Sequence, residues 1–261
     1  MKALVLNVDK HTLRMNFQAE QLKRLGIECE RIAARTPDNI TPEANDPYWN
    51  NWERPLKTVE KAILLTHQEA WEKVIAANMP MLILEDDAWL SKNTKEFLDE
   101  IAQTKNIEHV SLEIRGRKKL IARKSHQTVG GLRRLYQDRS GAAAYVLWPA
   151  GAKKLLARSH KNAGLADAMI CAAYEMSSWQ AVPPMALQLD KCETYGLEQP
   201  LNTTSAVTDD RQATSEIITK TLSHTFRRLS AQIKMGLRRI LTLHKAERVY
   251  LTPNRSDFTK I

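Results

Sequence analysis

Three consecutive acidic residues follow a short apolar run in the first third of the chain. Residues 81–84 are all apolar, and Glu85, Asp86 and Asp87 come directly after them. Such a run predicts a short buried strand, and like charges crowded at its end repel one another unless a cation lies among them. A hard divalent metal ion suits carboxylate ligands, and ligands of open α/β sheets bind beyond the carboxyl ends of strands. The pattern therefore indicates a metal-bound nucleotide at this point.

The same acids have a structural alternative. Acidic residues also favour the first turn of a helix, a role that Asn93 and Glu96 could fill a little further along. Asp167, a lone acid among small and apolar residues, has the same two interpretations: a helix N-terminal position or a catalytic carboxylate. His67 lies four residues after Ile63 on an apolar helix face, a spacing that favours a buried core histidine over a ligand.

Composition is typical of a folded protein with reduced thiols. The chain has 261 residues, of which 43% are hydrophobic, enough for a sizeable core. Its three cysteines are widely spaced and fit no metal-binding pattern, so we expect a cytosolic setting without disulfides. No apolar stretch reaches membrane-spanning length, and the N-terminal run is too short for a signal peptide. We expect a soluble or peripheral protein.

Positive charge is concentrated near the C-terminus. The net charge is +9, and residues 211–248 contain nine cations and two acids, so the remainder is close to neutral. Nucleic acid and an anionic membrane surface are the partners that such a charge raises.

Strand and helix patterns alternate along most of the chain. The expected strands are residues 3–6, 28–33, 81–84, 110–114, 141–148 and, at a sheet edge, 182–188; the expected helices are 12–25, 58–77, 94–102 and 152–158. Residues 37–55 form a long loop of the kind that is more often functional than idle. This order predicts an α/β fold with a mostly parallel central sheet.

A basic run and an amphipathic segment stand apart from that pattern. The run contains Arg115, Arg117, Lys118, Lys119, Arg123 and Lys124 and is either a solvated loop or a phosphate-binding segment. Residues 217–243 carry apolar side chains at three- and four-residue intervals with cations between them. This helix must be covered by the domain, by a second copy or by an anionic bilayer.

Several stretches together resemble glycosyltransferase family 25, the enzymes of lipopolysaccharide and lipooligosaccharide synthesis. The matching residues, in chain order, are Val5, Leu6, Asn7, Asp9 and Arg14; Glu60, Thr66, His67 and Trp71; Leu84, Glu85, Asp86 and Asp87; and Gly141, Tyr145, Ala152, Leu155 and Asp167. The resemblance covers about residues 3–206. Thr66 replaces the usual serine, Leu64 stands near the usual cysteine and Trp148 stands where serine is common, but none of these departures removes an acid.

The resemblance implies a GT-A-like, single Rossmann-type domain at residues 1–206, followed by a basic amphipathic helical extension at 207–261. It also implies a UDP-sugar donor, most often UDP-galactose, bound with Mn²⁺ or Mg²⁺, and transfer with inversion to a lipid-linked core oligosaccharide. A metal ion neutralises the charge of a diphosphate leaving group. Asp87 is then the first candidate for the metal ligand, with Glu85 and Asp86 in the same nucleotide and metal site.

The resemblance assigns roles to five other residues. Asp167 is the candidate base that deprotonates the acceptor hydroxyl. Asn7 and Asp9 form an edge that binds uridine, Arg14 lies near the phosphates, and His67 supports the site.

The predicted function is thus a glycosyltransferase at the cytoplasmic face of the inner membrane, peripherally bound. Two other classes are kept as alternatives. A nucleic-acid-binding protein or metal nuclease would explain the charge, but no nucleic-acid-binding motif is present in the sequence. An inactive membrane-associated scaffold would keep the fold without the chemistry, and retention of all three acids argues against it.

Overall fold

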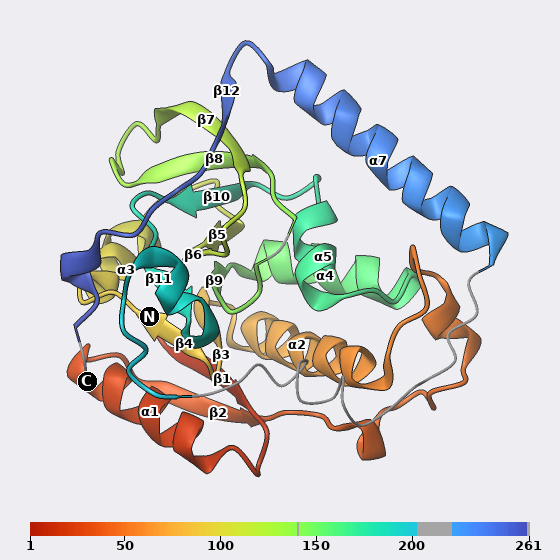
Figure 1. Ribbon diagram of the computed structural model, residues 1–261, viewed down its shortest axis with the longest axis horizontal. Helices are drawn as coiled ribbons and strands as arrows, with labels where there is room; N and C mark the ends of the chain where they lie inside the picture. Colours follow the sequence, from red (N-terminus) through yellow and green to blue (C-terminus); the bar gives the residue numbers. More distant parts are fainter. Residues whose placement is uncertain (140, 203–220, 260–261) are drawn as a thin grey trace.

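A computed structural model describes residues 1–139, 141–202 and 221–259. Within these residues a large mixed sheet is covered by helices on both faces, and a smaller sheet lies beside it (Figure 1). The larger sheet contains β1 (Ala3–Asn7), β2 (Cys29–Ala33), β3 (Met81–Glu85), β5 (His109–Ser111), β7 (Lys119–Ser125), β8 (Leu132–Gln137), β9 (Ala144–Leu147), β10 (Ser178–Ala181) and β12 (Ala246–Val249). The smaller contains β4 (Ala88–Leu90), β6 (Glu113–Ile114) and β11 (Ala186–Gln188). The helices are α1 (Thr12–Arg24), α2 (Thr58–Ala77), α3 (Thr94–Ala102), α4 (Pro149–Lys161), α5 (Ala166–Ala172) and α7 (Leu222–Thr242).

The central strands are buried on both faces because their side chains alternate between two hydrophobic clusters. In β3, Met81 and Ile83 pack in one cluster with residues of α2, α4 and α5. Leu82 and Leu84 pack in the other with residues of α1 and α3. The continuous apolar run that predicted this strand is therefore explained by helices on both sides.

The larger sheet has the order β12-β7-β8-β10-β5-β9-β3-β1-β2. β2, β1 and β3 are parallel to one another, as are β10 and β5, whereas the remaining neighbours are antiparallel. The predicted α/β class is confirmed, with a sheet that is mixed. Leu6 is the register partner of Glu85, so the end of β1 lies beside the acidic turn after β3.

The smaller sheet begins directly after that turn. Its order is β4-β11-β6, with β4 beginning at Ala88, directly after the three acids. The prediction of an edge strand at residues 182–188 is wrong: β11 lies in the middle, since both β4 and β6 hydrogen bond to it and the prolines precede its first residue.

Five strands, β4, β7, β8, β10 and β12, were not predicted. The basic run is a loop only in its first half, because Lys119, Arg123 and Lys124 lie in β7. β7 pairs with β8 and β12, and β10 joins β8 to β5. Only the first half of β7 is buried, so its sequence lacks a regular alternation. β12 returns the chain to the larger sheet after the C-terminal helix.

That helix, α7, lies along one side of the molecule (Figure 1). Arg227 Nη1 donates a hydrogen bond to the carbonyl of Asn50 at 2.9 Å, and the Arg238 guanidinium lies 4.3 Å from the centroid of the Tyr174 ring. The helix is thus held at both ends. The predicted start of the amphipathic segment, at residues 217–220, lies outside the described residues.

None of the described helices is long and apolar enough to cross a membrane.

Candidate active site

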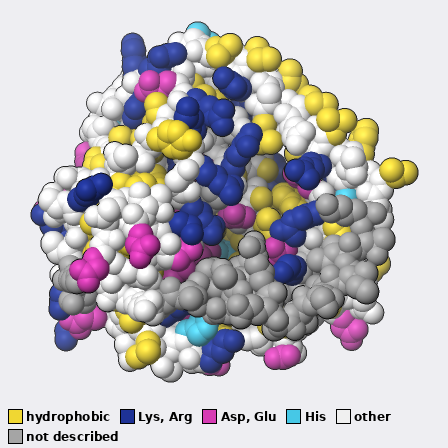
Figure 2. Space-filling view, viewed as in Figure 1, with side chains coloured by type: hydrophobic (Ala, Val, Ile, Leu, Met, Phe, Trp, Pro, Cys, Tyr) yellow, Lys and Arg dark blue, Asp and Glu magenta, His cyan; other side chains and the backbone are white. Residues whose placement is uncertain are grey.

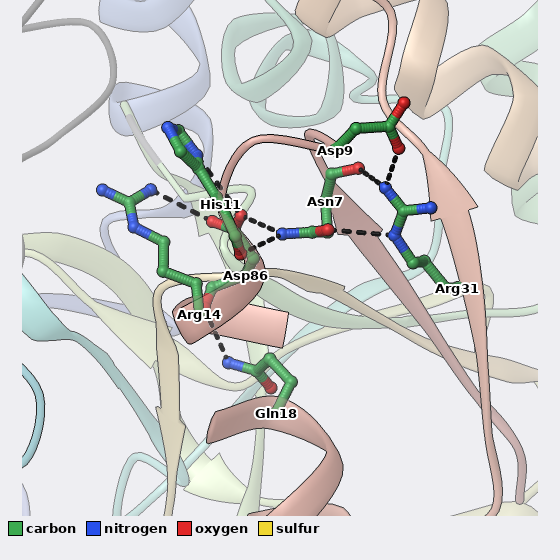
Figure 3. A network of polar contacts seen from close by, with 7 residues as sticks. All are labelled: Asn7, Asp9, His11, Arg14, Gln18, Arg31 and Asp86. Carbon is green, nitrogen blue, oxygen red and sulfur yellow. Dashed lines mark hydrogen bonds and ion pairs between the residues drawn. The ribbon is translucent and has the colours of Figure 1, made fainter. Parts of the chain in front are cut away.

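Asp86 is fixed by polar groups from β1 and α1 (Figure 3). Asn7 Nδ2 donates a hydrogen bond to its Oδ2 at 2.7 Å, and Arg14 Nη1 pairs with its Oδ1 at 3.1 Å. His11 Nδ1 lies 3.7 Å from the same carboxylate. All three partners come from the end of β1 or the start of α1, which the parallel β1–β3 pairing brings beside the acidic turn. Asp86 is therefore a buried acid whose charge is already compensated.

The partners of Asp86 are themselves held in place. Arg31 Nε donates to Asn7 Oδ1 at 2.9 Å, and its Nη2 pairs with the exposed carboxylate of Asp9. The amide of Asn7 is thus engaged through both its nitrogen and its oxygen. The structure places Asn7, Asp9 and Arg14 in one network around Asp86 (Figure 3).

Two buried glutamines of α1 hold the backbone of the acidic turn. Gln18 Nε2 donates to the carbonyls of Asp86 and Ala88, at 3.1 and 2.7 Å. Gln21 Nε2 donates to the Ala88 carbonyl at 2.8 Å, and its Oε1 accepts from the Leu90 amide at 2.9 Å. These bonds satisfy backbone groups that would otherwise be buried without partners. Sequence reasoning missed both residues, whose only signal is that glutamines occupy the inner face of a helix.

Asp87 has the opposite environment. Its side chain is buried, and Oδ1 has no hydrogen-bond partner in the described structure. Burial raises the pKa of this carboxyl to about 7, helped by the charges of Glu85, Asp86 and Asp190 and opposed by Arg14. An ionised carboxylate at this position is costly unless a cation joins it.

Glu85 lies between the acidic turn and a buried aromatic cluster. His67 Nε2 is 3.5 Å from Glu85 Oε1, while His67 Nδ1 is 2.9 Å from the hydroxyl of Tyr145. Trp71 Nε1 donates to that hydroxyl at 2.8 Å, which leaves the hydroxyl proton free to bond to His67 Nδ1. The Nε2 proton then points toward Glu85. His67 is fully buried, as its spacing predicted, and its Nε2 lies near one of the three acids, Glu85.

Glu113 is an acid of this region that sequence reasoning missed. It lies on β6, is 1% exposed, and accepts a hydrogen bond from the Ala143 amide at 2.7 Å while its Oε2 has no partner among the described residues. Burial and the charge of Glu85 raise its pKa to about 8. A Cβ atom at Gly141, whose φ is +139°, would lie 3.2 Å from Glu113 Oε1, so the close packing requires glycine. A single acid inside an apolar strand was the available signal.

Asp167 lies in the first turn of α5, where its Oδ1 accepts from the Ala168 amide at 2.7 Å. Burial raises the pKa of its carboxyl, and the charge of Glu85 raises it further, whereas Arg115 and His67 lower it. The carboxylate is therefore within electrostatic range of Glu85. The helix interpretation of Asp167 is confirmed, and its catalytic role stays a prediction.

The described residues contain no ready cluster of three or more His, Cys, Asp or Glu side chains arranged to hold a metal ion. Two of the carboxylates, those of Asp87 and Glu85, nevertheless suit a metal ion. Asp87 supplies a buried oxygen without a partner, and Glu85 is close enough to raise the pKa of Asp87. Mg²⁺ and similar ions are often held by one or two carboxylates together with substrate phosphates. The donor set is therefore suited to a hard divalent cation that arrives with a phosphorylated ligand.

The site and fold describe an α/β protein with acids at the carboxyl end of a central strand. The sequence profile of glycosyltransferase family 25 (LPS biosynthesis protein) matches residues 1–170. The chain belongs to this family and is a glycosyltransferase, which confirms the resemblance seen in its motifs.

No curated protein matches the chain. Solved structures with partial similarity include a glycosyltransferase involved in the glycosylation of the major capsid of PBCV-1, at 11% identity, 60% coverage of this chain, 64% of that chain and a TM-score of 0.31. Mannose-1-phosphate geranyltransferase from Thermus thermophilus has 13% identity, 71% and 58% coverage, and a TM-score of 0.34. The inositol-1-phosphate CTP transferase from T. maritima has 9% identity, 69% and 88% coverage, and a TM-score of 0.35. The chain thus spans less than two thirds of the first two, and similarities this low carry no argument about its activity.

Proposed function

We propose that this glycosyltransferase moves galactose from UDP-galactose to a lipopolysaccharide or lipooligosaccharide core saccharide, with inversion at the anomeric carbon. The observation that carries the proposal is Asp87, a buried carboxylate with an unpartnered oxygen at the carboxyl end of β3. The family supports a sugar donor, and the position supports a nucleotide bound beyond the strand ends.

The three acids have separate roles in this proposal. Asp87 and Glu85 hold a divalent cation, Mn²⁺ or Mg²⁺, which neutralises the diphosphate charge as the glycosidic bond breaks. Asp86 is engaged with Arg14 and Asn7, so it positions the donor-binding end of β1 and does not ligate metal. His67 orients Glu85 through the hydrogen bond that its other nitrogen forms with Tyr145.

Asp167 is the base. Inversion requires a group that removes the proton of the acceptor hydroxyl on the face opposite the leaving group. The raised pKa of Asp167 makes its carboxylate a better proton acceptor than a solvated one. The positive charge of Arg115 opposes this rise in the pKa of Asp167.

The proposed location is the cytoplasmic face of the inner membrane. α7 exposes a row of large apolar side chains: Leu222, Phe226, Leu229, Ile233, Leu237, Ile240 and Leu241. A helix with such a row and several cations suits the surface of an anionic bilayer, where a lipid-linked acceptor is also found. In this proposal residues 1–206 carry the chemistry and α7 makes the membrane contact, since β12 and Phe258 pack on the domain.

A thermal-shift panel of nucleotide sugars tests the proposal. In the presence of Mn²⁺, UDP-galactose should raise the melting temperature of the full chain, and Asp87→Asn should abolish the rise. Asp257→Asn, at a buried acid beside Lys92, serves as the matched control and should keep the shift. If no nucleotide sugar shifts the folded wild-type protein, the proposal is refuted.

A further inference from the structure

A large cavity separates α7 from the body of the protein. Its volume is about 1110 Å³, more than most small-molecule pockets hold, and its walls come from α7, α5, β12 and the loops around residues 51–54, 117 and 139. Ten of the lining residues are Lys or Arg and two are acidic. Figure 2 shows Lys and Arg side chains gathered over this hollow, with hydrophobic side chains along the outer rim of the molecule.

Seven of these ten cations have side chains without a hydrogen bond or ion pair in the described part of the chain. Arg54 and Arg158 are paired, with Glu60 and Glu175, and the lining acid Asp138 is paired with Lys119 at 2.6 Å. The other lining acid, Glu53, interacts electrostatically with Arg228. Among the described residues, no hydrogen bond or ion pair engages the side chains of seven lining residues: Arg117, Lys118, Arg139, Arg228, Lys234, Arg239 and Arg248. Cations that converge without counter-charges repel one another, which is a cost that an anionic ligand removes.

The cavity is built into the fold. Arg227 binds the carbonyl of Asn50 near one end of α7, and Arg238 packs on the Tyr174 ring and donates to the Tyr136 carbonyl near the other. β12 continues from the helix and pairs with β7, which fixes Arg248 opposite the loop that carries Arg117. The unpaired cations are therefore presented from several anchored segments.

The cavity lies next to the proposed base, and none of the residues proposed to bind the sugar donor lines it. Leu165 and Ala168 line it, on either side of Asp167 in the sequence, and the lining residue Arg54 interacts electrostatically with Asp167. Asp167 itself does not line the cavity, and neither do Asn7, Glu85 and Asp87. The donor diphosphate is accounted for at the acidic turn. The cations across the cavity thus need a second anion, one carried by the molecule that Asp167 deprotonates.

We propose that this cavity binds phosphate groups on the acceptor, so that the substrate class is a saccharide bearing two or more phosphates next to the sugar that is extended. This inference rests on the proposed function, because Asp167 is the base only if the chain transfers a sugar. Arginine, which supplies five of the seven unpaired cations, presents paired donors that match phosphate oxygens. Bilayer headgroups could supply the same chemistry, and the experiment below separates the two sources.

The test measures binding by calorimetry to the full-length protein. The probes are deacylated lipooligosaccharide core with its phosphates, the same core after its phosphates are removed, and phosphatidylglycerol vesicles. Lys234→Gln with Arg239→Gln should weaken binding of the phosphorylated core about tenfold at low salt and leave the dephosphorylated core unchanged. The matched control is Arg123→Gln with Lys124→Gln. It also removes two exposed cations, from the basic run that contains Arg117, but these do not line the cavity, so this variant should bind the phosphorylated core like wild type.

A second variant, Arg117→Gln, lies outside α7 and keeps the test valid if the helix variant does not fold. Equal binding of the two cores, or unchanged binding by both cavity variants, would overturn the proposal. If the cavity variants lose only the binding of vesicles, the cations bind lipid headgroups and the proposal is also overturned. If the protein binds an oligothymidylate more tightly than the core, and the cavity variants weaken that binding, the cations bind nucleic acid instead.

Titration of UDP-galactose with Mn²⁺ separates the two proposals. If the donor does not bind but the phosphorylated core still does, through the cavity cations, the proposed function fails and the cavity assignment stands. If the donor binds and the cavity variants bind the phosphorylated core as tightly as wild type does, the cavity assignment fails and the proposed function stands.

Discussion

Replacing Asp87 with asparagine removes a buried negative charge while keeping the size of the side chain. In the metal-free protein this charge is unfavourable, because Oδ1 has no partner and Glu85, Asp86 and Asp190 all raise its pKa. Asp87 therefore destabilises the folded protein when no cation is bound. Asp87→Asn should increase stability while it abolishes activity.

The size of the effect follows from the pKa. A rise from 3.8 to about 7 corresponds to about 4 kcal/mol of unfavourable free energy once the group is ionised in both states. The folded state binds the proton more tightly, so the wild-type protein should lose stability as the pH rises from about 4 to about 7 and should stay at the lower value above pH 7. Because the asparagine amide also lacks partners, we expect a net gain of about 2 kcal/mol at pH 8 and little gain at pH 4.5.

Urea unfolding in EDTA at pH 4.5 and pH 8 measures this difference. Asp86→Asn is the matched control, since it changes the neighbouring acid in the same way but breaks the buried pair with Arg14, and it should destabilise by about 3 kcal/mol at pH 8. Saturating Mn²⁺ should stabilise wild type by more than 2 kcal/mol at about 100 times its dissociation constant and leave Asp87→Asn unchanged. If Asp87→Asn is less stable than wild type at pH 8, the assignment of an uncompensated charge to Asp87 is wrong.

Three further outcomes are expected. Asp167→Asn should lower kcat by about 10²- to 10⁴-fold without changing donor binding in calorimetry, and a wild-type rate would exclude it as the base. Because burial raises the pKa of Glu113 to about 8, the wild-type protein should lose stability as the pH rises from about 4.5 to 8. In urea unfolding at pH 9, Glu113→Gln should be more stable than wild type by about 2 kcal/mol. A variant less stable than wild type at this pH would contradict the expectation. Ile233→Ser with Leu237→Ser, both on the exposed row of α7, should reduce sedimentation with phosphatidylglycerol vesicles at least about tenfold while turnover of a soluble acceptor is kept, and unchanged sedimentation would refute the membrane contact.

Elements with a strong periodic pattern were predicted closely from the sequence. The helix expected at residues 58–77 is α2 to the residue, and the strand expected at 81–84 is β3 with one residue added. Among the strands that were missed or misplaced, β7 and β8 are longer but lack a regular alternation of buried and exposed residues, and β10, β11 and β12 have only three or four residues. So few residues carry too little periodicity, and their pairing is decided by tertiary contacts.

The candidate site shows the same limit. The acidic triplet and Asp167 could be identified as chemistry-bearing residues, but the triplet itself does not distinguish Asp86 from Asp87. The difference arises because Arg14, some seventy positions earlier, pairs with one and not the other. Glu113 and Asp190 approach the site only through the smaller sheet and the segment after β11, a topology that the sequence pattern did not predict.

Transfer of galactose to a deacylated core saccharide tests the central claim most directly. With UDP-galactose and Mn²⁺, the wild-type protein should release UDP and extend the saccharide, EDTA should stop the reaction, and Asp87→Asn should reduce the rate at least about 100-fold. A folded Asp87→Asn protein that transfers galactose at the wild-type rate would contradict the claim that the acid at the end of β3 holds the cation and the donor diphosphate.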